Sequence, residues 1–267
     1  MALVEIRNVV KVYRTEGVLG QAQREVRAVN GVSLDIRSGE TVGLVGESGC
    51  GKSTLGRMVL RLIEPTSGSI RFENQDLLTL SKPELRRLRR QMQIIFQDPF
   101  ASLNPRMRVA EIVTEPLLIH EPSKRSKAEL GEAAAEMMRA VGLDQAALQR
   151  YPHEFSGGQR QRIGIARALI LRPRLVICDE PVSALDVSVG AQIVNLLKQL
   201  QRDFGLTLFF ISHSMPVVRY LSDRIAVMRR GEIVEIGDTE TITSSPQHEY
   251  TQTLIEATPE PEFIAGS

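Results

Sequence analysis

The spacing of hydrophobic residues changes along the chain, and each change predicts a different element. From Val32 to Ile36, apolar and polar residues alternate, as in a strand with one buried face. Between residues 130 and 141, apolar positions recur at intervals of three and four, as on one face of a helix. Ser126 and Glu129 have the spacing of a capping box, so we expect that helix to begin there.

Short apolar runs elsewhere predict buried strands. They lie at Thr41–Val45, Leu175–Cys178 and Thr207–Ser212, and two further strands are expected at residues 224–228 and 233–236. Helical patterns separate several of these runs in the second half of the chain, which is typical of a doubly wound sheet. We therefore expect one large α/β domain that carries an inserted helical region.

A glycine-rich segment follows the first of these runs and matches the phosphate-loop pattern G-x-x-x-x-G-K-S/T in full. It consists of Gly46, Glu47, Ser48, Gly49, Cys50, Gly51, Lys52 and Ser53, with Thr54 opening a predicted helix over residues 54–62. A strand before the loop and a helix after it are the context that the motif requires. Backbone N–H groups of such a loop hold phosphates, Lys52 would contact the β- and γ-phosphates, and Ser53 would offer a hydroxyl to Mg²⁺.

Two carboxylates directly follow the strand Leu175–Cys178. Asp179 suits an acid that holds Mg²⁺ through water, because this ion usually keeps several waters. Glu180 would face the γ-phosphate as the general base that orients or deprotonates the attacking water. The alternative is that adjacent acids merely end a strand at the surface. Their place after the carboxyl end of a strand favours a site.

Three more polar residues fit a nucleotide site. Gln97 follows an apolar strand and carries the acceptor that a metal or a water needs. His213 ends the strand Thr207–Ser212, where its imidazole would reach the γ-phosphate. We expect Glu180, His213 and Gln97 to be catalytic. Asp186 either contributes to nucleotide binding or only caps the helix that follows it.

The segment Ser156, Gly157, Gly158 and Gln159 combines a capping box with two glycines. A helix should therefore begin at this point, and the glycines would let another group approach the backbone closely. The N–H groups and the positive dipole end of a helix N-terminus together form an anion site. Taken alone, the segment is also consistent with an ordinary helix cap after a glycine turn.

Composition narrows the class of protein. With 33 basic and 32 acidic residues, the chain gives no support for a nucleic-acid partner. Its longest apolar runs fall far short of the roughly 20 residues of a transmembrane helix. The segment Met1–Val12 reads as a strand rather than a signal sequence. Cys50 and Cys178 suit a reducing compartment, and Cys50 is either a small residue that fits the loop or a thiol with a lowered pKa.

From the phosphate loop at Gly46 to His213, these motifs occur in the order and spacing of an ABC ATPase domain, and the resemblance covers nearly the whole chain. It implies an α/β fold: a RecA-like P-loop NTPase core with an N-terminal antiparallel β subdomain and an inserted α-helical subdomain. The implied division places the core and β subdomain in residues 1–97 and 172–240, the helical signature subdomain in 98–171, and a C-terminal tail in 241–267.

Three segments further resemble the oligopeptide, dipeptide and nickel importer group: residues 96–106, 180–189 and 245–252. This resemblance implies the ATP-hydrolysing subunit of a bacterial importer, with small peptides as cargo and nickel chelates or opine-like solutes next. One alternative is the ATPase of a soluble complex, as in phosphonate breakdown. A simple P-loop kinase would lack the Ser156–Gln159 helix start, and a translation- or chromosome-associated ABC protein would be longer.

The resemblance also implies roles and partners. Tyr13 would stack on adenine, although a tyrosine at a strand end also fits a core position. The Ser156 cap would bind the γ-phosphate of a nucleotide held by a second ATPase subunit, and a heterodimer is favoured over a homodimer. The residues after Gln97 would receive a helix from one of two permease subunits. A substrate-binding protein would deliver the cargo to these permeases.

The expected cofactors are ATP and Mg²⁺, and the expected location is peripheral, on the cytoplasmic face of the cell membrane. Many relatives carry several C-terminal cysteines that hold an iron–sulfur cluster. This sequence ends at Ser267 with no such cysteines, so we predict no cluster.

Overall fold

The computed structural model of the chain describes residues 2–15, 24–98, 100–121 and 125–257. Met1, Pro99 of the segment 96–106, and residues 258–267 of the predicted tail lie outside the described residues. The chain divides into two compact units, one formed by residues 1–81 with 209–267 and the other by residues 82–208. The subdomain boundaries at residues 97 and 171 stay a prediction, and each unit is described by itself below.

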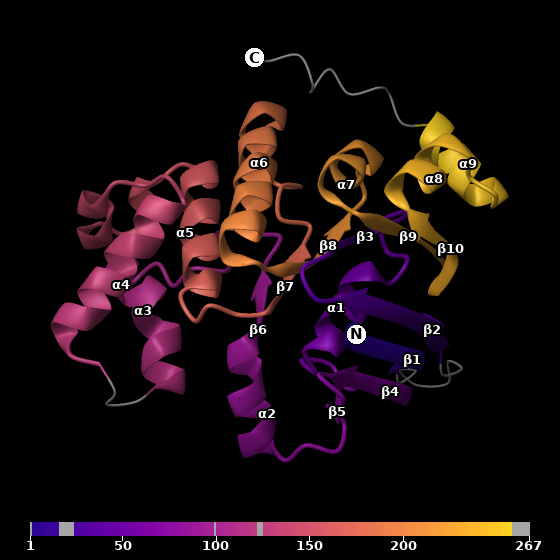
Figure 1. Ribbon diagram of the computed structural model, residues 1–267, viewed down its shortest axis with the longest axis horizontal. Coiled ribbons are helices and arrows are strands. Elements are labelled where there is room, and N and C mark those ends of the chain that lie inside the picture. The colour runs from indigo at the N-terminus through magenta and orange to yellow at the C-terminus, as the bar shows by residue number, and fades with distance from the viewer. Residues whose placement is uncertain (1, 16–23, 99, 122–124, 258–267) are drawn as a thin grey trace. The chain divides into compact units, whose positions relative to one another are not determined.

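The first unit begins with an antiparallel sheet in the order β2-β1-β4-β5. Its strands are β1 (Ala2–Thr15), β2 (Arg24–Arg37), β4 (Ser67–Phe72) and β5 (Gln75–Asp76), and Figure 1 shows β2, β1 and β4 side by side. The alternation predicted for Val32–Ile36 is confirmed, because Val32, Leu34 and Ile36 are all buried. Burial of one sheet face explains the period of two.

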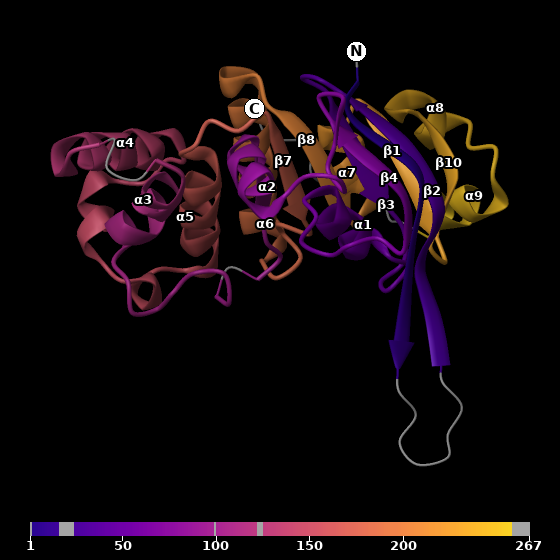
Figure 2. The same cartoon turned by 90° about the horizontal axis from the view of Figure 1, so that it is seen from below.

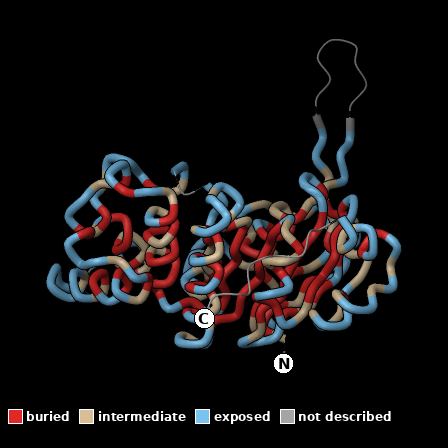
Figure 3. The backbone as a smooth tube through the Cα atoms, turned by 90° about the horizontal axis from the view of Figure 1, so that it is seen from above, coloured by how far each residue is buried: buried red, intermediate tan, exposed pale blue. Residues whose placement is uncertain are grey.

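Beyond this sheet, β1 and β2 continue as a two-stranded ribbon (Figure 2). Pairing of β1 with β4 ends at Val10, whereas its pairing with β2 continues to Thr15. Tyr13 lies on the ribbon opposite Val26, and both side chains are exposed. Most of this part of the ribbon is coloured as exposed in Figure 3. Tyr13 is therefore not a core residue.

The other strands of the first unit neighbour one another in the order β10-β9-β3-β8. They are β3 (Thr41–Val45), β8 (Thr207–Ser212), β9 (Arg224–Arg229) and β10 (Glu232–Asp238), and β8 runs across the boundary between the units. Strand β9 is parallel to β3 and antiparallel to β10. The helices of this unit are α1 (Lys52–Val59), α7 (Met215–Leu221), α8 (Thr239–Ser244) and α9 (Glu249–Glu256).

The second unit is mainly helical. Its helices are α2 (Lys82–Leu88), α3 (Val109–His120), α4 (Lys127–Ala140), α5 (Gly157–Leu169) and α6 (Val187–Phe204), with short 3₁₀ turns at Arg89–Gln91, Gln145–Gln149 and Pro152–Glu154. Strands β6 (Met92–Ile95) and β7 (Leu175–Asp179) pair in parallel. Both hydrogen bonds of the capping box predicted at Ser126 and Glu129 are present.

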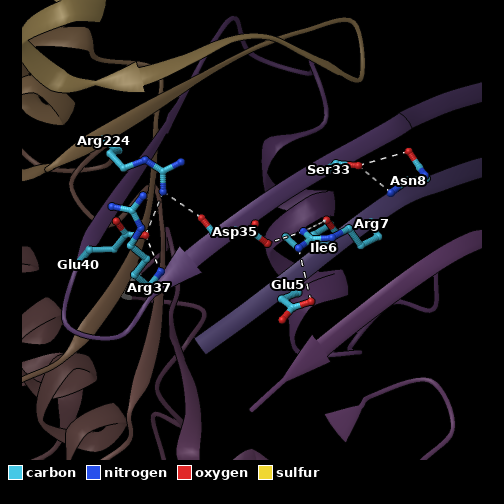
Figure 4. A network of polar contacts seen from close by, with 9 residues as sticks. All are labelled: Glu5, Ile6, Arg7, Asn8, Ser33, Asp35, Arg37, Glu40 and Arg224. Carbon is cyan, nitrogen blue, oxygen red and sulfur yellow. Dashed lines mark hydrogen bonds and ion pairs between the residues drawn. The ribbon is translucent and has the colours of Figure 1, made fainter. Parts of the chain in front are cut away.

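A polar network in the first unit holds the connection between β2 and β3 (Figure 4). The Arg224 guanidinium contacts the Glu40 carboxylate at 3.2 Å and donates to the Asp35 carbonyl at 3.1 Å. Glu40 also accepts from the Arg37 N–H at 2.5 Å. Only 17% and 11% of the Arg224 and Glu40 side chains are exposed, so removing either charge leaves the other partly buried without its partner.

We predict that Glu40→Ala lowers the free energy of unfolding by about 2 kcal/mol, because charged hydrogen bonds are lost at a mostly buried position. Glu25→Ala is the matched control. Glu25 pairs with Arg14 at 2.9 Å, but 49% and 73% of the two side chains are exposed. That change should stay within about 0.5 kcal/mol. Urea unfolding measures both, and equal losses would contradict the role of burial.

Candidate functional site

The predicted phosphate loop lies in the first unit between β3 and α1, and its shape depends on glycine. Gly46, Gly49 and Gly51 have φ values of 156°, 80° and 111°. A Cβ at Gly46 would lie 2.1 Å from the Met228 carbonyl oxygen, and one at Gly51 would lie 2.0 Å from the Ala28 carbonyl oxygen. Backbone therefore fills the space of any side chain at these two positions.

Hydrogen bonds from distant parts of the chain hold the same loop. The Gly231 N–H, in the turn between β9 and β10, donates to the Cys50 carbonyl at 2.9 Å. The Glu47 N–H donates to the hydroxyl oxygen of Tyr250, on α9, at 3.1 Å. The loop is thus fixed near both ends by segments that follow it by about two hundred residues in the sequence.

Lys52 is buried under the loop, with 3% of its surface exposed. Its Nζ donates to the carbonyl oxygens of Gly46 at 2.7 Å and Glu47 at 2.8 Å. Helix α1 begins at Lys52, two residues before the predicted start, because the Leu55 N–H already bonds to the Gly51 carbonyl at 2.9 Å. Ser53 and Thr54 accordingly lie in the first turn of the helix and are half-buried.

Cys50 is also buried, and desolvation by burial raises the pKa of its thiol although Lys52 acts in the opposite direction. The hypothesis of a thiol activated by the helix N-terminus is therefore wrong. The side chain fills space beside Gly46, where a Cβ would lie 3.1 Å from Sγ. Cys50 serves the loop as a small apolar residue.

Tyr13 and His213 lie in the same unit. The Tyr13 side chain is 39% exposed, and the Lys11 Nζ lies 5.2 Å from the centre of its ring. His213 directly follows β8 and is exposed. An exposed ring face at Tyr13 fits a stacking role, which stays a prediction, as does the contact of His213 with a γ-phosphate.

In the second unit, Ser156 is the N-cap of α5, as predicted. The Gln159 N–H bonds to the Ser156 hydroxyl at 3.4 Å, and the Gln159 side-chain oxygen accepts from the Ser156 N–H at 3.0 Å. Both residues are exposed. The first N–H groups of a helix find no partner within it, so this exposed end is suited to an anion.

A hollow of about 390 Å³ is lined by this helix start, by the segment before α6 and by the first turn of α6. Its lining consists of Ser156, Gly157, Gly158, Ser183, Ala184, Leu185, Asp186 and Val189. Gly158 lies so close to α6 that a Cβ there would be 2.4 Å from the Val189 Cγ1. Asp186 occupies the N-cap position of α6, but within the described chain its side chain makes no capping hydrogen bond. A capping hydrogen bond therefore does not account for this aspartate, and its contribution to nucleotide binding stays a prediction.

The two predicted acids differ in their surroundings. Asp179 ends β7 and is 1% exposed, whereas Glu180 is half-buried. Glu180 has a φ of 49°, a left-handed conformation that is rare for residues other than glycine. The Ser183 N–H and hydroxyl both donate to the Glu180 carbonyl, at 3.3 and 3.0 Å, and hold this turn. Strain of this kind is common where a side chain must point in a set direction.

Gln97 follows β6 and is exposed, and helix α5 anchors the segment around it. The Gln161 side chain donates to the Phe96 carbonyl at 3.4 Å, and the Arg167 guanidinium donates to the Ser102 carbonyl at 2.5 Å. Burial lowers the pKa of Arg167, which marks the cost of placing that charge inside the unit. The helix that starts at Ser156 therefore also fixes the residues that follow Gln97.

Comparison with known proteins gives the family. Residues 29–183 match the family described as "ABC transporter". The chain belongs to this family. Residues 234–265 match a second description, "Oligopeptide/dipeptide transporter, C-terminal region". As an ABC protein the chain is an ATP-binding ATPase.

Its relatives carry related names. The chain is 54% identical over 240 residues to the putative oligopeptide transport ATP-binding protein YkfD of Bacillus subtilis, covering 90% of this chain and 73% of that protein. It is 52% identical over 242 residues to the oligopeptide transport ATP-binding protein OppF of Escherichia coli, covering 91% and 72%. A putative peptide import ATP-binding protein of Brucella ovis is 52% identical over 260 residues, covering 97% and 80%.

Solved structures confirm the predicted ABC ATPase fold. The ATP-binding cassette MJ0796, in a dimeric post-hydrolysis state bound to ADP and Pi, superposes with a TM-score of 0.79 at 32% identity, covering 88% of this chain and 98% of that one. CbiO1 of Clostridium perfringens superposes with a TM-score of 0.77 at 24% identity, covering 91% of each chain. Among the described residues, no helix has the length and apolar character needed to cross a bilayer.

One contact at the phosphate loop has no counterpart in the sequence-based predictions. Tyr250 belongs to the segment 245–252, for which the family resemblance implies no particular role. Its hydroxyl reaches the Glu47 N–H, and the Arg229 guanidinium lies 4.8 Å from the centre of its ring. No local pattern signals this contact, because the partners are 203 residues apart.

We predict that Gly158→Ala lowers the free energy of unfolding by about 1–3 kcal/mol, because the added methyl meets Val189. Val189→Ala in the same protein should recover much of the loss. Gly164→Ala is the control, since a Cβ at that position of the same helix would have no neighbour within 4 Å among the residues that the structure describes. It should stabilise by about 0.5–1 kcal/mol. Denaturant unfolding measures all three, and equal losses at both glycines would contradict the close approach to α6.

Proposed function

We propose that this chain is the ATP-hydrolysing subunit of a bacterial ABC importer for peptides. The observation that carries this proposal is the match of residues 234–265 to the C-terminal region of oligopeptide and dipeptide transporters. The names of the relatives, which are 52% to 54% identical, support the same cargo. They favour import over the ATPase of a soluble complex. Nickel chelates and opine-like solutes remain the next candidates.

The chain would supply parts of two ATP sites. Its phosphate loop would hold one ATP, with the backbone and Lys52 on the phosphates and Tyr13 on the adenine. The Ser156–Gln159 helix start and Asp186 would face an ATP held by a second ATPase subunit. The exposed, capped N-terminus of α5 supports this division, since it offers N–H groups to an anion outside its own helix. A heterodimer stays favoured over a homodimer.

The donor set fits Mg²⁺. The Ser53 hydroxyl, the Gln97 amide oxygen and the Asp179 carboxylate are hard oxygen ligands of the kind this ion takes, directly or through water. When bound, Mg²⁺ would neutralise charge on the phosphates. Glu180 would accept a proton from the attacking water, and the rigid turn at its backbone supports a fixed direction for its carboxylate. His213 would contact the γ-phosphate.

The assembled importer would contain two permease subunits and take its cargo from a substrate-binding protein. The exposed segment after Gln97 would receive a permease helix, so this chain would lie peripherally at the cytoplasmic face of the membrane. Helix α5 holds that segment and has Ser156 as its N-cap. A movement of the permease helix would therefore be transmitted to the Ser156–Gln159 helix start through α5. Closure around ATP and reopening after hydrolysis would then drive alternating access.

The test is uptake of a labelled peptide by cells that lack this chain. Wild-type protein should restore uptake. Glu180→Gln should still bind ATP but hydrolyse it at least about a hundredfold more slowly, the usual scale for loss of a general base, and should not restore uptake.

Glu25→Gln, at an exposed ion pair on β2, is the matched control and should restore uptake fully. Uptake that is unchanged in cells without the chain would contradict peptide import. Near-normal ATP turnover by Glu180→Gln would contradict the assignment of the base.

A further inference from the structure

The C-terminal region reaches the phosphate loop through one hydroxyl group. Tyr250 lies in α9 and is 5% exposed, and its hydroxyl oxygen accepts the Glu47 N–H at 3.1 Å. Tyr250 falls within residues 234–265, the region matched to oligopeptide and dipeptide transporters, whereas Glu47 falls within the general ABC match. A region shared with peptide transporters is therefore in direct contact with the nucleotide loop.

The start of α9 is tied to the neighbouring strand. Glu235, on β10, accepts the N–H groups of Gln247 at 2.8 Å and His248 at 3.1 Å. Burial acts to raise the pKa of Glu235, yet these hydrogen bonds and those of its other neighbours hold the pKa below its usual value. His248 caps the helix, because its Nδ1 accepts the Tyr250 N–H at 3.1 Å. The backbone of Tyr250 is thus fixed relative to β10.

The ring of Tyr250 is held as well. The Arg229 guanidinium, at the end of β9, lies 4.8 Å from the ring centre, within the range of a cation–π contact. Burial raises the pKa of the Tyr250 hydroxyl, so this group stays protonated and neutral at physiological pH. A neutral hydroxyl accepts a hydrogen bond from a backbone N–H and adds no charge beside the phosphates.

Glu47 connects Tyr250 to the lysine of the loop. Its N–H bonds to the Tyr250 hydroxyl, and its carbonyl oxygen accepts from the Lys52 Nζ at 2.8 Å. Lys52 also bonds to the carbonyl of Gly46, the residue before Glu47. Turning the backbone at Glu47 would therefore move the acceptors that set the position of the ammonium.

We propose that Tyr250 is a positioning residue for ATP, which holds Glu47 and through it Lys52 in the arrangement that receives the phosphates. The inference rests on the ATP-binding part of the proposed function and is independent of the cargo. Without the hydroxyl, the loop would spend less time in the competent arrangement, and apparent affinity falls by that fraction. Once ATP is bound, the phosphates themselves hold the loop, so the hydrolysis rate should change little.

The test is Tyr250→Phe, which keeps the buried ring and removes only the hydroxyl. The full-length chain should bind ATP about three- to tenfold more weakly, the effect of one lost hydrogen bond. The maximal rate of ATP hydrolysis by the assembled complex should stay within about twofold of wild type. Tyr220→Phe, at an exposed tyrosine on α7, is the matched control and should leave ATP affinity unchanged.

Arg229→Gln provides a second variant that leaves the hydroxyl in place. It should weaken ATP binding in the same direction but less, and adding it to Tyr250→Phe should cost less than the sum of the two single changes. Unchanged ATP affinity in Tyr250→Phe would overturn the proposal. A maximal rate that falls in parallel with affinity would also overturn it. If the affinity falls as expected but cells lacking the chain import peptides normally, only the importer assignment fails.

Discussion

Backbone packed against backbone sets the shape of the phosphate loop. Carbonyl oxygens of Met228 and Ala28 lie where side chains would begin at Gly46 and Gly51. A loop confined in this way presents its N–H groups without having to reorganise, which is what binding of a phosphate requires. Other contacts of the loop depend on that conformation. They are the hydrogen bond from the Gly231 N–H, the hydrogen bond to the Tyr250 hydroxyl and the burial of Lys52 beneath the loop.

In the second unit, a glycine again allows backbone to pack closely against a neighbouring element. Gly158 allows α5 to approach Val189 of α6, and the capping box at Ser156 orients the first turn. The same helix holds the segment after Gln97 through Gln161 and Arg167. In each unit, a helix N-terminus next to glycines is proposed to hold an anion. In the second unit, the same helix also holds the segment proposed to contact the permease.

Local patterns in the sequence were enough to predict many of the strands and helix starts. The strands Thr41–Val45 and Thr207–Ser212 and the capping boxes at Ser126 and Ser156 depend on neighbouring residues, and all are observed where predicted. Contacts between residues far apart in the sequence could not be predicted from such local patterns. The Tyr250 hydroxyl could not be placed from sequence. The two interpretations of Cys50 could not be separated either, because the burial that raises its pKa depends on how the loop packs.

The central claim is that the phosphate loop acts within its own subunit while the Ser156 cap acts on the nucleotide of another. ATP binding by the isolated chain and ATP hydrolysis by the assembled complex, measured side by side for Ser156→Arg, test it most directly. The arginine would fill the exposed cap of α5. The account predicts unchanged ATP affinity in the isolated chain and loss of hydrolysis in the complex. Loss of ATP binding by the isolated chain would contradict it.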